Sequence, residues 1–295
     1  MDFLRYLEGV RTDTLTNIFK CFTWFGEELF VLTILCSMFW CFNKRLAYRI
    51  CFSYFISGLA IQVLKITFKI PRPWLIDKDF NPVPSALKTA TGYSFPSGHT
   101  QSATALYGTL FVNSKKSSKR WLFLLVIAGV GFSRMYLGVH TPKDVIVSIV
   151  VSAFLIYVMQ FILTDKVLKE NLLSISIMMV MISCGVLVYA ITRLKVGAIE
   201  LEYATDCCKA AAAGIGFSMG WYIENRYIDF QEKNPKRWIQ FVKIVLGIAG
   251  AILIKVGLKY IIGGSLAADV FRYIVLVLWV CAIYPAVIKK FFTVS

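Results

Sequence analysis

Stretches of about 20 mainly apolar residues recur along this chain, and this feature most constrains what it can fold into. Each stretch is long enough to cross the hydrocarbon core of a bilayer as a helix, and a backbone in lipid must satisfy its own hydrogen bonds. The 58% share of hydrophobic residues among 295 also exceeds the 45–50% of soluble domains. The pattern predicts an all-α, polytopic membrane helix bundle. About nine transmembrane helices are expected, at residues 23–42, 47–68, 99–113, 121–139, 143–163, 172–191, 208–224, 238–257 and 271–288.

The first 22 residues are too polar to span a membrane, and they lack the basic start and apolar core of a cleavable signal peptide. Their apolar residues favour an amphipathic helix at the membrane interface. These residues are Phe3, Leu4, Leu7, Val10, Leu15 and Phe19. We therefore expect three parts: an amphipathic interfacial segment at 1–22, a core at 23–163 that holds the unusual polar residues, and additional transmembrane helices at 164–295.

The net charge of +15 does not indicate nucleic acid, because the basic residues sit mainly at the ends of the predicted spans. Lysine and arginine at such positions set orientation, and the rule holds best for short loops. A bare count over all loops does not decide the orientation. The compact clusters "NKR" (43–45) and "KKSSKR" (115–120) favour the cytoplasmic side. We therefore predict an integral protein of the cell (plasma) membrane, with its histidine-bearing loops outside.

Three polar groups interrupt the apolar pattern at what is predicted to be one membrane face. Their notable residues are Lys65 and Arg72 in "LKITFKIPRP", Ser97, Gly98 and His99 in "PSGH", and Arg134, His140 and Asp144 in "SRMYLGVHTPKD". Taken singly, most have ordinary explanations: Lys65 can snorkel at a helix end, Ser97 can cap a helix, and Asp144 can follow the N-cap Thr141. Arg134 is harder to explain, because an unpaired arginine after the apolar run 121–132 is costly.

Together, the positive residues of these groups form a cradle for a phosphoryl group. Lys65, Arg72 and Arg134 supply three positive charges, and arginine forks match phosphate oxygens bidentately. Ser97 and Gly98 stand at a predicted helix start, where free N–H groups attract anions and glycine permits close approach.

The only two histidines of the chain lie in the second and third groups, where they can do the chemistry. His140 and Asp144 are four residues apart, so they share a helix face if the helix starts there. A carboxylate on one imidazole nitrogen leaves the other free to attack phosphorus. His99 would protonate the leaving oxygen. No carboxylate cluster for Mg²⁺ or Zn²⁺ is visible, and the eight cysteines fit no metal spacing, so we expect neither metal nor cofactor.

These three groups resemble the motifs of the type-2 phosphatidic-acid phosphatase superfamily, which includes lipid phosphatases, glucose-6-phosphatase and the vanadium haloperoxidases. The family pattern is a lysine, six residues and Arg-Pro; then Pro-Ser-Gly-His; then Ser-Arg, five residues, His, three residues and Asp. Every position matches in 65–73, 96–99 and 133–144. The resemblance covers residues 25–163 and implies a phosphatase core of the vanadium-haloperoxidase type.

The resemblance also implies a role for each residue. His140 would be the nucleophile and form a phospho-histidine, His99 the acid, and Asp144 the group that orients His140. The phosphate would be held, without metal, by Lys65, Arg72, Ser97, Gly98 and Arg134.

The expected substrate is a lipid phosphate or diphosphate of the bilayer, of the polyprenyl diphosphate or phosphatidic acid type; the oligomeric state is not predicted. We call residues 74–95 the roof segment, since they join two of the motifs. There we expect Trp74 and Phe80 to reach acyl or prenyl chains, although interfacial anchoring is the commoner role of such a tryptophan. Asp77 and Asp79 would repel a second phosphate, and Lys78 and Lys88 would attract one.

Three alternatives remain open from the sequence. The nine-span plan is similar to that of glucose-6-phosphatase, which would make the substrate a sugar phosphate. A phosphate-lipid transporter or flippase would bind the same group, but the repeats and broken helices typical of transporters are not convincing here. A catalytically silent binding protein is disfavoured by the intact nucleophile and acid.

Overall fold

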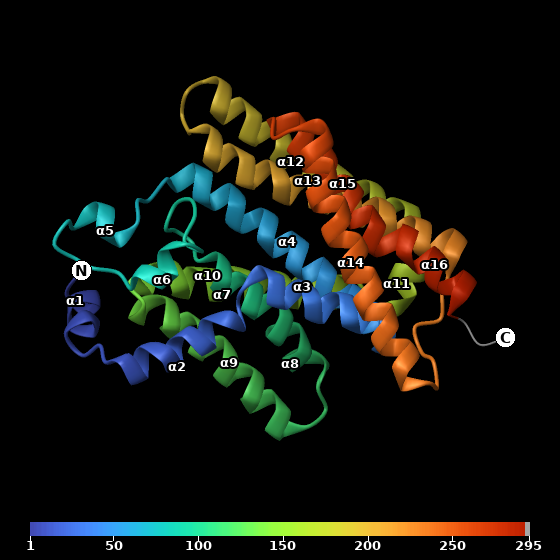
Figure 1. Ribbon diagram of the computed structural model, residues 1–295, viewed down its shortest axis with the longest axis horizontal. Coiled ribbons are helices and arrows are strands. Elements are labelled where there is room, and N and C mark those ends of the chain that lie inside the picture. The colour runs from blue at the N-terminus through green and yellow to red at the C-terminus, as the bar shows by residue number, and fades with distance from the viewer. Residues whose placement is uncertain (293–295) are drawn as a thin grey trace. The chain divides into compact units, whose positions relative to one another are not determined.

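The computed structural model describes residues 1–292, and these residues are helical with no β-strand among them (Figure 1). The predicted all-α fold is thus confirmed for the described part of the chain. The chain divides into two compact units. Unit 1 comprises Met1–Leu32 and Phe52–Met159, and unit 2 comprises Thr33–Cys51 and the chain from Gln160 onward.

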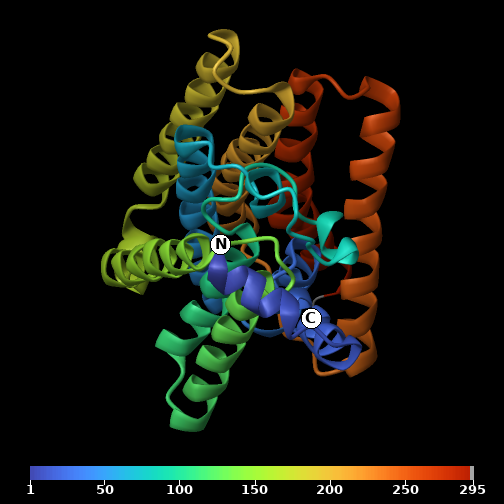
Figure 2. The same cartoon turned by 90° about the vertical axis from the view of Figure 1, so that its left-hand side faces the viewer.

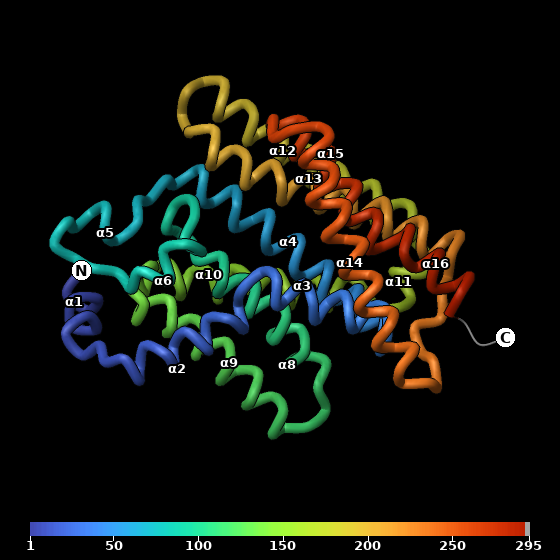
Figure 3. Tube along the Cα trace, in the orientation of Figure 1, coloured from blue at the N-terminus to red at the C-terminus, as the bar shows by residue number. Residues whose placement is uncertain are grey.

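Unit 1 contains all three polar groups, and helices α2 and α7 both pack against α9 within it. Its elements, some of which continue into unit 2, are α1 (Asp2–Gly9), α2 (Asp13–Trp24), α3 (Glu28–Ser37), α4 (Lys44–Phe68), α5 (Pro73–Ile76), α6 (Pro84–Leu87), α7 (Gly98–Ala103), the π-helical turn η2 (Thr104–Gly108), α8 (Thr109–Asn113), α9 (Ser117–Tyr136) and α10 (Pro142–Ile162). The irregular connection from α4 through α5 and α6 to α7 is visible in the chain trace (Figure 3).

The ends of these helices follow from local sequence. Helix α4 stops at Phe68, and Lys69 takes a left-handed conformation with φ 52° before the two prolines that flank Arg72. Ser97 caps α7, its Oγ accepting the backbone N–H of Thr100 at 3.4 Å. Because η2 continues α7 into α8, residues 98–113 form one helical rod that begins at the "PSGH" motif.

The turn between α9 and α10 requires a glycine. Gly138 has φ +79°, a conformation that favours glycine, and a Cβ there would lie 2.7 Å from Arg11 Nη2 and 2.8 Å from Phe80 Cζ. The turn folds back so that the N–H groups of Val139 and His140 both donate to the carbonyl of Arg134, at 3.1 and 3.3 Å. The sequence "SRMYLGVH" thereby brings Arg134 and His140 into one tight loop.

The N-terminal helix α1 packs on the protein through two leucines. Leu4 and Leu7 are buried in an apolar cluster with residues of the roof segment and of the turn after α9. The other buried members of this cluster are Phe80, Val83, Ala86, Tyr136, Leu137 and Val139. Phe3 and Tyr6 on the same helix are exposed. The helix is amphipathic as expected, and its placement at the membrane interface stays a prediction.

Unit 2 is built around α13, which packs against α12 and α15 (Figure 2). Its elements beyond the shared helices are η1 (Met38–Phe42), α11 (Asp165–Glu170), α12 (Leu172–Lys195), α13 (Leu201–Ile223), η3 (Glu224–Ile228), α14 (Arg237–Ile262), α15 (Leu266–Leu278), η4 (Trp279–Ile283) and α16 (Tyr284–Phe291). Three of them, η1, η3 and η4, are π-helical turns.

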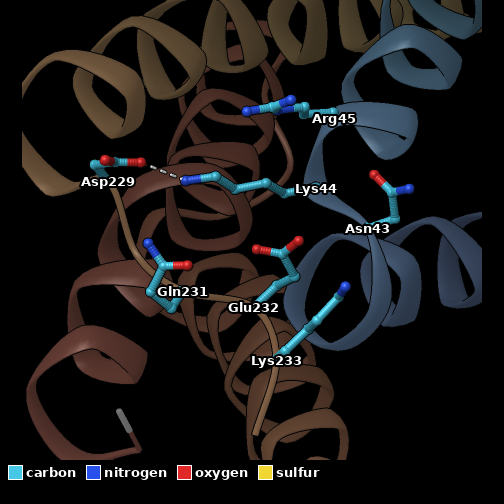
Figure 4. A pocket seen from close by; sticks show the side chains of 7 residues that line it. All are labelled: Asn43, Lys44, Arg45, Asp229, Gln231, Glu232 and Lys233. Carbon is cyan, nitrogen blue, oxygen red and sulfur yellow. Dashed lines mark hydrogen bonds and ion pairs between the residues drawn. The ribbon is translucent and has the colours of Figure 1, made fainter. Parts of the chain in front are cut away.

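A polar pocket of about 420 Å³ lies at one end of unit 2 (Figure 4). It is lined by Asn43, Lys44, Arg45, Asp229, Gln231, Glu232 and Lys233. Lys44 crosses it to pair with Asp229 at 2.6 Å. No residue of the three motifs lines this pocket, so it is separate from the predicted site.

Within residues 1–292, five helical stretches are long and apolar enough to cross a membrane. They are Lys44–Ile76, Pro142–Ile162, Leu172–Lys195, Arg237–Ile262 and Leu266–Phe291. The pair Asp13–Trp24 and Glu28–Phe42, bent by 44°, makes a sixth if it counts as one span. Helices also occupy the predicted spans 99–113, 121–139 and 208–224, but they do not meet this length and hydropathy test. The count of nine therefore stays a prediction.

Candidate active site

All eight predicted site residues belong to unit 1, and several of them are in direct contact. Arg72 Nη1 lies 2.9 Å from His140 Nε2, and His140 Nδ1 lies 3.6 Å from Asp144 Oδ2. The N–H of Ser97 donates to the Asp144 carbonyl at 3.1 Å, which joins the "PSGH" motif to the start of α10. The structure thus brings parts of all three motifs together.

The contact with Arg72 fixes the tautomer of His140. A guanidinium in a protein is always protonated and only donates, so His140 Nε2 must be the acceptor and carry the lone pair. The proton of the neutral ring then sits on Nδ1, on the side of Asp144. Nε2 is therefore the nitrogen of His140 that carries the lone pair.

Asp144 is held by two hydrogen bonds to the same oxygen. Oδ2 accepts from Ser94 Oγ at 2.6 Å and from the Thr141 N–H at 2.8 Å. The 3.6 Å separation from His140 Nδ1 is longer than a hydrogen bond, so in this state the interaction is electrostatic. Among the described residues, no hydrogen-bond partner reaches His140 Nδ1. Ser94, fully buried, was not among the residues expected from the sequence.

The electrostatic surroundings keep the His140 imidazole neutral. Burial, followed by the charges of Arg72, Arg134 and Lys65, holds the pKa of His140 well below its usual range. A nucleophilic imidazole must be unprotonated. Its environment thus favours the neutral form of His140, the form that the predicted nucleophile would need.

Two of the expected phosphate-binding cations also hold the end of the roof segment. Arg72 donates from Nε to the Gly92 carbonyl at 3.0 Å and from Nη2 to the Thr91 carbonyl at 2.5 Å. Lys65 Nζ donates to the Tyr93 carbonyl at 2.6 Å. These bonds place the segment that carries Ser94, so both cations have a structural role besides any contact with phosphate.

Arg134 is the cation with the most hydrogen-bonding capacity left over. Its side chain is fully buried, and Nη1 donates to Thr23 Oγ1 at 2.8 Å. Its Nε and Nη2 are buried and find no hydrogen-bond partner among the described residues. Nε and one Nη form one edge of the guanidinium, the geometry that accepts two oxygens of a phosphate or carboxylate.

Ser97 and His99 differ in how they are engaged. The Ser97 hydroxyl accepts from both the N–H and the Oγ of Thr100, and the Ser97 carbonyl accepts from Ser148 Oγ at 2.7 Å. By contrast, no hydrogen bond to the His99 ring is formed within the described residues. The residue before it, Gly98, begins α7 and has open space where a Cβ would be. The backbone at Gly98 is therefore unobstructed on that side.

The roof segment corrects two expectations about specificity. Phe80 is only 2% exposed and packs against α1, so it is not available to an acyl or prenyl chain; the exposed large apolar residues of the segment are instead Leu75, Ile76 and Leu87. Asp77 forms two hydrogen bonds with Arg5, at 2.9 and 2.7 Å, which neutralises the charge expected to repel a second phosphate.

Within residues 1–292, no group of three or more His, Cys, Asp or Glu side chains is arranged to hold a metal ion. The charges assembled around the two histidines are those of Lys65, Arg72 and Arg134, and all three act on both rings. This arrangement suits an oxyanion.

Comparison with known families supports the grouping of these motifs. Residues 46–168 match the PAP2 superfamily, and residues 208–294 match the PAP2 superfamily phosphatase, transmembrane extension. The chain therefore contains a PAP2 superfamily domain followed by a PAP2 transmembrane extension. All three motifs fall inside the first match, and the N-terminal 45 residues lie outside both.

The chain is also similar to individual proteins. It is 29% identical over 188 residues to the probable sphingosine-1-phosphate phosphatase of Dictyostelium discoideum, covering 57% of this chain and 44% of that protein. It is 33% identical over 98 residues to the undecaprenyl-diphosphatase BcrC of Bacillus subtilis, covering 33% of this chain and 48% of that protein. The chain thus spans less than half the length of these curated relatives.

Among solved structures, the chain is similar to the crystal structure of Aquifex aeolicus LpxE, with a TM-score of 0.46 and 24% identity. That similarity covers 54% of this chain and 92% of LpxE.

Proposed function

We propose that this protein is an integral membrane phosphatase that hydrolyses a lipid phosphate or diphosphate through a phospho-histidine at His140. The observation that carries the proposal is that a neutral imidazole, His140, which could attack phosphorus, and a buried guanidinium edge, on Arg134, which could bind the phosphate, belong to the same site. The lone pair of His140 Nε2 accepts a hydrogen bond from Arg72, which would turn to a phosphoryl oxygen before the attack, and Arg134 keeps two buried donors without a partner among the described residues. A buried, unsatisfied guanidinium edge costs stability unless a ligand completes it.

In the proposed reaction, His140 Nε2 attacks phosphorus and the bond from phosphorus to the leaving oxygen breaks. The electron pair goes to that oxygen, which takes a proton from the imidazolium form of His99, a form that the negative charge of the bound phosphate would favour. A water molecule then attacks the phospho-histidine, giving its proton to His99, and inorganic phosphate leaves with His140 restored. Asp144 stabilises the positive ring that forms on His140.

Positive charge would stabilise the pentavalent transition state. Arg134 would bind two phosphoryl oxygens through Nε and Nη2, and Lys65 and Arg72 would add charge from the roof side. The backbone N–H of Gly98, at the start of α7 next to Ser97, would approach a third oxygen. With these groups the chemistry needs no metal.

Two chemical classes of substrate have support from the relatives. One is a lipid monophosphate, as the name of the Dictyostelium relative indicates for that protein, and the other is a polyprenyl diphosphate, as for the Bacillus relative. The exposed Leu75 and Ile76 beside Arg72 would lie against the lipid tail. We further propose the nine-span arrangement, a core of the vanadium-haloperoxidase type at 23–163 with added spans at 164–295, and a site facing outside the cell membrane.

The direct test is phosphate release by the purified full chain in detergent, with a panel of a long-chain base phosphate, phosphatidic acid, a polyprenyl diphosphate and glucose 6-phosphate. We expect turnover of at least one lipid substrate in EDTA, and inhibition by micromolar orthovanadate, which mimics a five-coordinate phosphate. Activity that EDTA abolishes and Mg²⁺ restores would overturn the metal-free mechanism. Turnover of the sugar phosphate alone would replace the lipid assignment.

Orientation has its own test. Single cysteines placed at Asp79 and Ser117, in a background without reactive native cysteines, should differ in labelling by an impermeant reagent. We expect the cysteine at 79 to react in intact cells and the one at 117 only after lysis. The reverse pattern would place the site on the cytoplasmic side.

A further inference from the structure

The N-terminal helix α2 reaches the candidate site, although it lies outside both family matches. It packs along α9, the helix that carries Arg134. Just after α2, Gly26 approaches the backbone of His99 so closely that a Cβ would lie 2.6 Å from the His99 carbonyl oxygen and 2.6 Å from Val130 Cγ1. This part of the chain therefore contacts the elements that carry two of the three motifs.

One side chain of α2 makes a polar contact with the site. Thr23 Oγ1 accepts a hydrogen bond from Arg134 Nη1 at 2.8 Å. It is the side-chain acceptor of Arg134 within the described residues, since Nε and Nη2 have none. Glu27, in the turn between α2 and α3, supplies an attractive charge interaction with the same guanidinium.

The hydrogen bond from Arg134 to Thr23 also determines how the rest of the guanidinium is oriented. The group is planar and rigid, so fixing one nitrogen and the plane fixes the directions of the other donors. With Nη1 engaged by Thr23, the edge formed by Nε and Nη2 remains for a ligand. The Thr23 hydroxyl is uncharged, so this hydrogen bond itself does not neutralise the arginine.

We propose that Thr23 is a positioning residue of the phosphatase site: it orients Arg134 so that Nε and Nη2 receive two oxygens of the phosphoryl group. The inference rests on the proposed function and extends the site to the N-terminal segment. Binding of the oxyanion by Arg134 then depends on α2, a helix that carries none of the motifs.

The test replaces the hydroxyl and keeps the shape. Thr23→Val removes the acceptor, Thr23→Ser restores it, and Thr14→Val is the matched control on the exposed side of the same helix. For each purified full-length variant, KM and kcat are measured with the best lipid substrate, together with thermal stability. The dissociation constant of orthovanadate is measured by calorimetry.

We expect Thr23→Val to weaken orthovanadate binding and to raise KM by about tenfold or more, the scale of a hydrogen bond to a charged group. Thr23→Ser should stay within about threefold of wild type, and Thr14→Val should not differ. A purely structural Thr23 would give lower thermal stability with unchanged orthovanadate affinity, and that result would overturn the inference.

A double-mutant cycle shows whether Thr23 acts through Arg134. In an Arg134→Lys background the planar fork is gone, so adding Thr23→Val should cause little further loss of orthovanadate affinity. Fully additive losses would contradict the mechanism. If wild type binds orthovanadate but releases phosphate from no substrate, the proposed function fails while the binding comparison among the variants still decides this inference.

Discussion

Two buried charges in this molecule, Glu224 in unit 2 and Arg134 in unit 1, have opposite surroundings. Glu224 is fully buried and accepts from three donors: Lys44 Nζ at 3.1 Å, the Tyr48 hydroxyl, and the Phe230 N–H at 3.2 Å. Arg134 is equally buried, but only Nη1 is engaged by a side chain, and its Nε and Nη2 have no partner among the described residues.

The difference separates a charge that is paired within the fold from one that keeps donors for the proposed ligand. Removing a charge from water is costly, and a protein offsets the cost by pairing it fully, as at Glu224. At Arg134 the compensation is incomplete, so the fold bears a cost that an oxyanion would remove. Composition alone would not distinguish them, since both lie near helix ends in an apolar chain.

The largest effect should follow from His140→Ala. Loss of the attacking nitrogen should lower phosphate release by about 10⁴-fold or more, while thermal stability changes little. Asp144→Asn, which keeps Ser94 as a neighbour but removes the charge, should be impaired less. Phosphate release by the alanine variant at a near-normal rate would remove His140 as the nucleophile.

The opposite outcome is expected at Glu224. Glu224→Ala leaves Lys44 and Tyr48 without their shared acceptor and should destabilise the fold by about 3 kcal/mol. Its kcat per folded molecule should remain within about twofold of wild type. Glu202→Ala on the exposed side of α13 is the matched control, with a small effect on denaturation midpoint. A Glu224 variant with normal stability but lost activity would break the distinction between the two buried charges.

The helices and the grouping of the motifs could be predicted from sequence, because both depend on short-range patterns. Apolar stretches located the helices to within several residues, and the prolines on either side of Arg72 marked the end of one helix, whereas the turn at Gly138 became apparent only in the structure. The length of an apolar stretch could not reveal which helices cross the membrane. Helices α9 and α13 contain enough charged or small residues that they are not among the stretches apolar enough to cross it.

The contacts that complete the site could not be predicted, because they join positions far apart in the chain. Thr23 and Arg134 are separated by 111 positions, and neither sequence neighbourhood signals the other. Ser94 lies next to a motif, but a serine before "FPSGH" has no periodicity that would assign it to Asp144. Phe80 was wrongly assigned to a lipid tail because an aromatic residue in a polar segment suggested exposure, whereas α1 covers it.

The pH dependence should sharpen the assignment of the nucleophile. Since burial and the neighbouring cations lower the pKa of His140, the neutral reactive form should persist below pH 6.5. Activity should therefore fall only as pH drops through that lowered value, by about tenfold for each further pH unit. Two substrates whose phosphate groups titrate differently should share this acid limb. If activity began to fall already above pH 6.5, or at a pH that changes with the substrate, protonation of His140 could not be the cause of the fall.

The smallest effect should come from the exposed lysines of the roof segment. Lys78 and Lys88 are exposed and lie on either side of α6, and unlike Arg134 they compensate no buried charge. Solvent screening limits each to a modest attraction. Replacing both by alanine should lower kcat/KM a few-fold more for a diphosphate than for a monophosphate lipid, because only the diphosphate has a second phosphoryl group to attract.

This difference in kcat/KM between the two lipids should shrink as salt is raised, because the lysines are exposed. The loss of affinity in Thr23→Val should persist at high salt, since Thr23 acts on a buried group. An equal loss for both substrates would make the two lysines general steering charges. Discrimination would then have to lie with the exposed Leu75 and Ile76, which on this proposal would face the lipid tail and not the phosphate.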